Sequence, residues 1–268
     1  MKRFPYECIK IRDYVYHIAD IKGDYCTLII GEKLAILVDT GFGMSDLREY
    51  VESIIKTDYI VINTHGHPDH ILGDYRFDSV YISEPDIAII PYYSGDETLH
   101  ITLGHELKHL NLSEEEIAYY LQPKPITCKP LAIGTVFDLG GLHVEVVDLK
   151  GHTSGSIGLL IQEDRLLVAG DALNQYLWLF FEESTSVAEY IKTLERVALM
   201  PFDTFLSSHF GQEIPKEMYQ VHLANAKNLK VEGSTKELIL GFETYCSTYE
   251  TELGTSNIFF SKEKLTRP

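Results

Sequence analysis

Long apolar runs, paired cysteines and a surplus of basic residues are all missing from this sequence. No apolar run approaches the roughly 20 residues needed to cross a bilayer. The first residues, Met1 to Glu7, lack the apolar stretch and the cleavage site of a signal peptide. Four scattered cysteines form no C-x-x-C pair, which is typical of reduced thiols in the cytosol. We therefore expect a soluble, cytoplasmic protein without a membrane partner.

The charge balance excludes another class of partner. The chain has 23 Lys and Arg residues against 40 Asp and Glu residues, a formal net charge of −17. Nucleic-acid binding needs a clustered positive surface, so DNA and RNA are not expected as substrates. We expect a small-molecule substrate instead, and nothing in the sequence indicates an oligomeric state. A chain of 268 residues fits one domain, here taken as 1–268.

Short apolar runs rich in β-branched residues predict strands in both halves of the chain, and amphipathic spacing predicts helices between them. Ser45 is the expected N-cap of the first helix, and Gly31-Glu32-Lys33 the turn of an early hairpin. The architecture indicated is α/β, with two sheets packed together and helices outside. The expected strands are 14–18, 26–30, 34–38, 59–63, 80–83, 136–139, 142–149, 156–162, 165–169 and 204–206, and the expected helices are 45–56, 187–198 and 215–229.

The segment from about residue 84 to 130 has a different character. A capping box at Ser113-Glu114-Glu115-Glu116 predicts a helix that runs to about Leu121, where Pro123 and Pro125 end it. We interpret this segment as a helical insertion between two β-rich halves.

The strongest local signal is Thr64-His65-Gly66-His67-Pro68-Asp69-His70, which directly follows an apolar strand. A helix would point His65 and His67 to nearly opposite sides, and Gly66 and Pro68 also favour a loop. In an extended loop, His65 and His67 can face one ion while the turn at Pro68 directs Asp69 and His70 toward a second. Imidazole and carboxylate ligands suit zinc, with iron or manganese as substitutes.

Three further segments share one design, in which an apolar strand ends in a metal-ligand type of side chain beside glycine. They deliver His152 after Gly151, Asp171 after Gly170, and His209 before Phe210-Gly211. Each alone is common in strands without any metal. Their occurrence together after H-x-H-x-D-H indicates one metal centre.

This pattern resembles the metallo-β-lactamase superfamily, and particularly its glyoxalase-II-like branch. The five motif regions of that family are matched by Asp39 in Leu37-Val38-Asp39-Thr40-Gly41, by the T-H-G-H-P-D-H segment, and by His152, Asp171 and His209. The resemblance implies an αββα four-layer sandwich with two metals, expected to be zinc. One would be held by His65, His67 and His152, the other by Asp69, His70 and His209, with Asp171 bridging them. Asp39 would lie just beneath the metals as an acceptor that orients ligand histidines.

Such a centre suits hydrolysis. Two ions roughly 3.5–4 Å apart can share a hydroxide and hold both the attacking and the leaving atom. Two carboxylates and one hydroxide would leave the centre net positive, which fits an anionic carbonyl substrate. Asp69 can orient the hydroxide and carry its proton. Tyr176, which follows Asp171 in an aromatic stretch, is a candidate donor to the oxyanion; the alternative for this stretch is a place in the core.

His105-Glu106-Leu107-Lys108-His109 matches the H-E-x-x-H motif of zinc proteases. That site needs a long helix and a third ligand downstream. A new helix is predicted from Ser113, and no glutamate lies between Glu116 and Asp138. Solvent-facing charges on the insertion are the better interpretation, and contact with substrate is the other.

The ligand set leaves two chemistries open. The first is hydrolysis of a thioester, ester or lactone, since lactonases and glyoxalase II resemble this pattern. The second is an iron-dependent sulfur (persulfide) dioxygenase, in which positions matching His65, His152 and Asp171 hold one iron. True β-lactamases carry cysteine or serine where Asp171 lies, so antibiotic hydrolysis is disfavoured.

Overall fold

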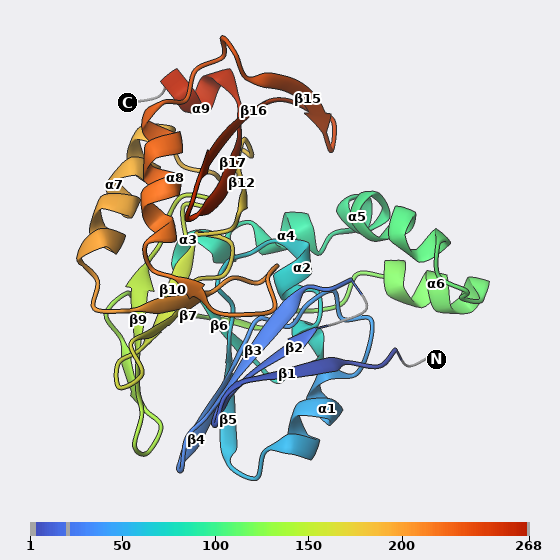
Figure 1. Ribbon diagram of the computed structural model, residues 1–268. Helices are drawn as coiled ribbons and strands as arrows, with labels where there is room; N and C mark the ends of the chain where they lie inside the picture. Colours follow the sequence, from blue (N-terminus) through green and yellow to red (C-terminus); the bar gives the residue numbers. More distant parts are fainter. Residues whose placement is uncertain (1–3, 20–21, 267–268) are drawn as a thin grey trace. The chain divides into compact units, whose positions relative to one another are not determined.

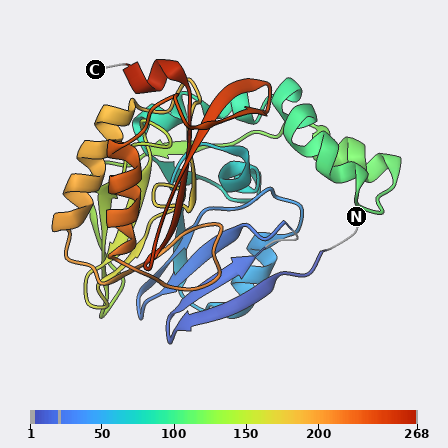
Figure 2. The same ribbon diagram turned by 45° about the horizontal axis from the view of Figure 1, so that its top comes forward.

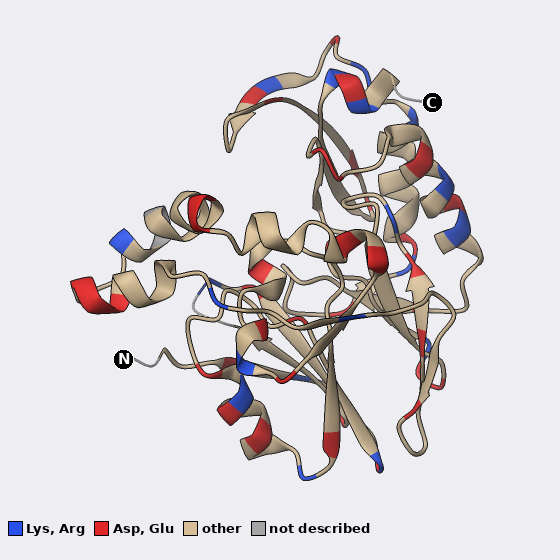
Figure 3. Ribbon diagram, turned by 180° about the vertical axis from the view of Figure 1, so that it is seen from behind, with Lys and Arg blue, Asp and Glu red and all other residues tan. Residues whose placement is uncertain are grey.

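The computed structural model describes residues 4–19 and 22–266, without the side chains of residues 105 and 106. The chain folds into two compact units, Met1–Ala132 with Asp138–Gly141, and Ile133–Phe137 with Leu142–Pro268. Both contain strands and helices, which confirms the predicted α/β class. In Figure 3 the Lys and Arg residues are scattered among Asp and Glu, so the negative net charge is spread along the chain.

A seven-stranded sheet forms the centre of the first unit, in the order β1-β2-β3-β4-β5-β6-β7. Each pair of neighbours from β1 to β4 is antiparallel, whereas each pair from β4 to β7 is parallel. The turn at residues 31–33 joins β3 to β4 as predicted. The strands are β1 (Glu7–Arg12), β2 (Val15–Ala19), β3 (Tyr25–Ile30), β4 (Leu34–Val38), β5 (Asp58–Ile62), β6 (Val80–Ile82) and β7 (Cys128–Pro130).

Helix α1 (Leu47–Ile54) packs on this sheet through Leu47 and Val51, which join a buried cluster with Leu28 and Leu37 (Figure 1). Its N-cap is Asp46, whose side chain accepts a hydrogen bond from the Glu49 N–H. The prediction of Ser45 as N-cap is therefore wrong. The Ser45 hydroxyl instead bonds to the backbone of Phe4, so the serine fastens an earlier segment.

The predicted helical segment holds four helices before the chain returns to the sheet at β7. Ser113 and Glu116 form the expected capping box of α6. Apolar side chains of these helices share a second buried cluster that includes Ile71, Leu103 and Tyr120. The remaining helices of this unit are α2 (Pro68–Ile71), α3 (Glu84–Ile87), α4 (Ile90–Tyr93), α5 (Asp96–Lys108), α6 (Glu114–Leu121) and the 3-10 turn η1 (Asp74–Arg76).

The second unit has two sheets, with orders β14-β13-β11-β10-β9-β8 and β12-β17-β16-β15. Helices α7 (Val187–Leu199) and α8 (Met218–Lys227) lie side by side (Figure 2) and bury one cluster with both sheets. The strands are β8 (Val136–Asp138), β9 (His143–Asp148), β10 (Ile157–Ile161), β11 (Leu166–Val168), β12 (Tyr176–Leu179), β13 (Thr204–Leu206), β14 (Ile214–Pro215), β15 (Thr235–Ile239), β16 (Phe242–Thr251) and β17 (Gly254–Phe260), and α9 (Lys262–Thr266) follows.

The sheet that contains β15 to β17 was not predicted, and the last long helix begins at Met218 because Pro215 lies in β14. All four cysteines are free thiols, as expected. In the part of the chain that the structure describes, no helix combines the length and the apolar character that a bilayer crossing requires.

A buried histidine makes the stability of the second unit depend on pH. His222 in α8 is fully buried, with Nδ1 2.9 Å from the Ser256 hydroxyl of β17. Burial lowers the pKa of His222 to about 4 from its usual 6.5. Between these values the unfolded chain binds a proton that the folded chain does not, so this residue destabilises the fold as the pH falls through that window.

We expect the unfolding free energy to fall by about 3 kcal/mol from pH 7 to pH 4 through this histidine alone. The variant His222→Gln, which cannot take up that proton, should show a shallower decline in urea unfolding series. Exposed His100 supplies the control, because His100→Gln should leave the decline unchanged. Equal slopes for wild type and His222→Gln would contradict the assignment.

Candidate functional site

Two parallel strands position the first set of candidate ligands. β4 and β5 pair in parallel from Leu34 and Asp58 to Val38 and Ile62, so both strands end at one edge of the sheet. Asp39 follows β4 directly, and the segment from Thr64 to His70 follows β5. The Asp39 N–H donates to the Ile62 carbonyl at 2.9 Å, which extends the pairing past the strand end. The edge of the sheet thus brings the two motifs together.

Asp39 lies under the loop as a buried acceptor. Its backbone adopts a left-handed conformation, with φ of 62°, and its side chain is almost fully buried. One carboxylate oxygen, Oδ1, accepts from the Thr64 N–H at 2.7 Å. The other, Oδ2, lies 2.9 Å from both the Thr64 hydroxyl and His70 Nδ1. The carboxylate therefore holds both ends of the loop.

These bonds fix which nitrogen of each imidazole carries the proton. A carboxylate only accepts, so His70 Nδ1 donates to Asp39. The single hydroxyl proton of Thr64 also goes to Asp39, so the Thr64 oxygen accepts from His65 Nδ1 at 3.1 Å. In a neutral imidazole with a protonated Nδ1, the lone pair is on Nε2. His65 and His70 are thus both prepared to bind a metal through Nε2.

Helix α2 places the remaining two candidate ligands of this unit. His67 is the N-cap residue and Pro68 begins the helix, where its missing N–H costs nothing. The His67 ring lies edge-on to His65 at 4.8 Å and edge-on to Tyr93 at 4.8 Å. Asp69 Oδ2 is 3.3 Å from His70 Nε2. Ligand atoms of His65 and His67 lie within 4.8 Å of each other, as do those of Asp69 and His70.

The predicted insertion braces this loop from outside. Asp86 of α3 is fully buried and accepts the Gly66 N–H at 2.8 Å through Oδ2. A Cβ at Gly66 would lie 2.8 Å from Ile89 Cγ1, so only glycine fits between the two histidines. Asp86 was not predicted from the sequence, where it is one of two acidic residues in the short segment Glu84–Ile87 and no motif distinguishes it from Glu84.

A second buried carboxylate supports the end of the loop. Asp74 accepts from the Thr40 hydroxyl at 2.7 Å and from the Asn63 side-chain amide at 3.1 Å. The Asn63 amide also donates to the His70 carbonyl at 3.0 Å. Burial raises the pKa of Asp74 to about 8, against the opposing effect of these two hydrogen bonds. Burial therefore favours the neutral, protonated form of Asp74.

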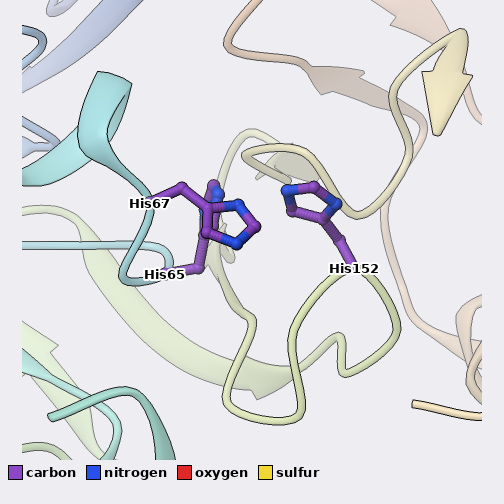
Figure 4. A group of neighbouring side chains, drawn as sticks. All are labelled: His65, His67 and His152. Atoms are coloured by element: carbon purple, nitrogen blue, oxygen red, sulfur yellow. The ribbon is translucent and has the colours of Figure 1, made fainter. Parts of the chain in front are cut away.

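The second unit also has a pair of parallel strands that end beside candidate ligands. β11 and β13 pair in parallel from Leu166 and Thr204 to Val168 and Leu206, and they too end at one edge. Asp171 follows β11 and His209 follows β13, while the Ser208 N–H donates to the Gly170 carbonyl at 3.2 Å. His152 follows β9 in the same sheet. Figure 4 draws His65 and His67 close together on the loop after β5, and His152 on the loop after β9.

A backbone carbonyl orients the ring of His152. Its Nδ1 lies 2.8 Å from the Trp178 carbonyl, which can only accept, so Nε2 again carries the lone pair. The Ser184 hydroxyl donates to the His152 carbonyl at 2.7 Å. A Cβ at Gly151 would lie 2.4 Å from the Tyr190 ring, and the Tyr190 hydroxyl donates to the Ala172 carbonyl at 3.0 Å. Tyr190 thus packs beside the loop that carries His152 and beside the loop that carries Asp171.

Asp171 lies between the two histidines of its unit. Its Oδ2 is 3.1 Å from His209 Nε2 and 3.7 Å from His152 Nε2. Two ligand atoms on one tetrahedral zinc, each about 2.0–2.1 Å from the ion, lie roughly 3.3 Å apart. The spacing of this oxygen from each nitrogen is close to that value. One carboxylate oxygen can therefore share a coordination sphere with either histidine.

The donors of both units fit a metal. They combine imidazole nitrogens with carboxylate oxygens, the set that suits zinc, iron and manganese. Three of the five histidines have Nδ1 committed to an acceptor, as ligand histidines generally do. Tyr176 has a side chain that is 57% exposed, at the start of β12. Of the H-E-x-x-H motif, α5 carries all but His109, and the side chains of His105 and Glu106 lie outside the described residues.

The sequence is similar to a known family and to several characterised proteins. The family model of the metallo-beta-lactamase superfamily matches residues 22–209, more than half of the chain. Acyl-coenzyme A thioesterase MBLAC2 of Homo sapiens is 24% identical over 192 residues, which cover 63% of this chain and 65% of that protein. The chain thus spans less than two thirds of this relative's length. Hydroxyacylglutathione hydrolase GloC of Haemophilus influenzae is 26% identical over 151 residues, covering 56% and 66%.

Solved structures agree on the fold. A metallo-beta-lactamase from Pontibacter korlensis aligns with a TM-score of 0.61 at 17% identity, covering 84% of this chain and all of that one. A metallo-beta-lactamase family protein from Thermus thermophilus aligns at 0.58 with 19% identity, covering 84% and 79%. At such identities the likeness shows the fold, and it confirms the metallo-β-lactamase fold expected from the sequence. Together with the match to the family model, it places this chain in the metallo-beta-lactamase superfamily.

Proposed function

We propose that the chain is a metal-dependent hydrolase that cleaves a thioester, ester or lactone of a small molecule with two bound metals. Zinc is the expected metal, with iron or manganese as substitutes. The names of two relatives, a thioesterase and a hydroxyacylglutathione hydrolase, support hydrolysis as the reaction class. The family model spans all seven proposed ligands, from His65 to His209.

In this proposal the seven ligands divide between two ions. His65, His67 and His152 would hold one ion, Asp69, His70 and His209 would hold the other, and Asp171 would be a ligand to both. The observation that carries the assignment is the position of Asp171 Oδ2, 3.1 Å from His209 and 3.7 Å from His152, two histidines assigned to different ions. Two ions that share one ligand require a carboxylate that lies close to histidine ligands of both ions.

The segment from about 84 to 130 has a supporting part in this proposal. Asp86 holds Gly66 between His65 and His67, and Tyr93 packs against the His67 ring. These contacts would fix the direction in which the two histidines point. We propose that the segment is a helical insertion in a single domain, and that it stiffens the ligand loop.

The ions, when bound, supply a water that ionises near neutral pH and a positive charge beside the substrate carbonyl. The water oxygen forms a bond to the carbonyl carbon, and the bond from that carbon to sulfur or oxygen breaks. One proton passes to the leaving group and the other is released from the carboxylic acid product. Asp69, whose side chain is 23% exposed, is placed to accept the first proton and pass it on. Tyr176, exposed on β12, is proposed to donate a hydrogen bond to the developing oxyanion.

The zinc- or manganese-loaded protein should hydrolyse members of a panel of thioesters, esters and lactones without consuming oxygen. Product release and an oxygen electrode measure the two activities in parallel. The rival chemistry, persulfide oxidation, needs redox-active iron and consumes oxygen. Oxygen uptake with glutathione persulfide by the iron-loaded protein, together with no hydrolysis across the panel, would decide for the rival.

Replacing the bridge should affect both metal positions. We expect Asp171→Ala to lose most of both zinc equivalents after dialysis, measured by atomic absorption, because one ligand is removed from each ion. Asp203→Ala is the matched control, since this carboxylate of the same unit is 63% exposed and pairs with Arg165. It should retain about two zinc ions per chain. Loss of only one equivalent in Asp171→Ala would contradict the bridging role.

Changing Asp69 should separate turnover from binding. Asn keeps the shape of the side chain but cannot accept the proton, so Asp69→Asn should lower kcat about a hundredfold or more, with KM changed much less. The measurement is steady-state kinetics on the best substrate of the panel, with metal content determined in the same sample. An unchanged kcat at full metal occupancy would exclude Asp69 from proton transfer.

A further inference from the structure

A cluster of aromatic rings lies beside His152 within the second unit. Trp178 is the third residue of β12, and Phe180 and Phe181, both nearly fully buried, follow the end of that strand. The Trp178 ring is 5.3 Å from that of Phe180 and 5.8 Å from that of Phe181, and the Phe181 ring is 6.3 Å from the His152 ring. Because the Trp178 carbonyl also orients His152, this cluster is continuous with a proposed metal ligand.

A distant part of the chain completes the cluster. Phe242, the first residue of β16, lies 5.7 Å from Phe180 and 5.6 Å from Phe181 between ring centroids. Unlike those two rings it is 41% exposed. It lies outside the part of the chain that matches the family model, residues 22–209. We call Trp178, Phe180, Phe181 and Phe242 the aromatic wall.

Strands β15 and β16 form a hairpin (Figure 1), and its register determines the face of the sheet on which Phe242 lies. The two strands are joined by Leu240 and Gly241, with φ of 49° and 87°, a tight turn of the type that suits hairpins. Ile239 pairs with Phe242 and therefore shares its face, whereas Leu238 pairs with Glu243 and lies on the opposite face. Leu238, 76% exposed, is thus a natural control for Phe242.

Charge argues for a neutral occupant of this face. Side chains alternate along β15, so Glu237 lies on the same face as Ile239, and Lys236 lies on the opposite face. There Lys236 Nζ forms an ion pair with Glu243 Oε2 at 2.6 Å. A carboxylate on the Phe242 face repels an anionic group. An exposed phenylalanine that continues a buried aromatic cluster instead favours contact with an apolar group.

We propose that the aromatic wall binds the apolar acyl arm of the substrate, and that Phe242 sets the preference for acyl length. This inference rests on the proposed function, because the arm is taken to belong to an ester or thioester whose carbonyl reacts beside His152. Each methylene removed from water against the wall should raise affinity by a factor of about four. Long acyl chains should therefore be preferred over acetyl.

The single tryptophan of the chain, Trp178, is part of the wall, so its fluorescence reports binding without any reaction. Decanoate, a product of the expected kind, should shift Trp178 emission in the metal-loaded protein, whereas acetate should not. The Kd for decanoate should rise about tenfold in Phe242→Ser and stay within twofold of wild type in Leu238→Ser. Phe242→Leu, which keeps an apolar side chain, should recover most of the affinity.

Kinetics supplies the second measurement. The ratio of kcat/KM for decanoyl over acetyl thioester should fall about tenfold in Phe242→Ser and remain unchanged in Leu238→Ser. Equal decanoate affinity in the two serine variants, or no response of Trp178 to decanoate, would overturn the inference. Decanoate binding that depends on Phe242, with no hydrolysis of any ester, would uphold the wall and reject the proposed function.

Discussion

The carboxylate of Asp39 is the constraint on which the first half of the site depends. It accepts hydrogen bonds from Thr64 and His70, and through the Thr64 hydroxyl it also determines the tautomer of His65. To reach this position the residue adopts a left-handed backbone, which aspartate tolerates better than most residues. Ligand histidines need a second partner to fix the direction of Nε2. Asp39 provides that partner directly for the candidate ligand His70 and, through the Thr64 hydroxyl, for the candidate ligand His65.

Both units bring candidate ligands together by the same arrangement of strands. In each, a pair of parallel strands ends at a shared edge, and the residues that follow carry the functional side chains: β4 and β5 in one unit, β11 and β13 in the other. Parallel pairing makes the carboxyl ends of distant segments neighbours without any further contact. Glycine then allows close packing where the loops pass other groups, as at Gly66 and Gly151. The rigid sheet thus sets the direction of the ligands, and the loops supply their chemistry.

The sequence was informative wherever the signal is local. The strands that precede His65, Asp171 and His209 were predicted within one or two residues, because apolar β-branched runs end there in glycine or polar residues. The capping box at Ser113 was found for the same reason. Partners chosen by tertiary structure were not predictable: Ser45 bonds to Phe4 instead of capping α1, and Asp86 reaches Gly66 from twenty residues away. The hairpin of β15 and β16 was missed because β15 is exposed along most of its length and shows no apolar alternation.

Asp86 also changes the electrostatics expected from the ligands alone. Two divalent ions, two ligand carboxylates and one hydroxide would sum to a net positive charge, which favours an anionic substrate. Two further buried carboxylates, Asp39 and Asp86, lie directly against the loop from Thr64 to His70, and their negative charges would offset that excess. A centre whose positive charge is outweighed by its surroundings would have little long-range attraction for an anion. Selection of a substrate would then depend more on contacts with its uncharged part, and the exposed ring of Phe242 is a surface suited to make them.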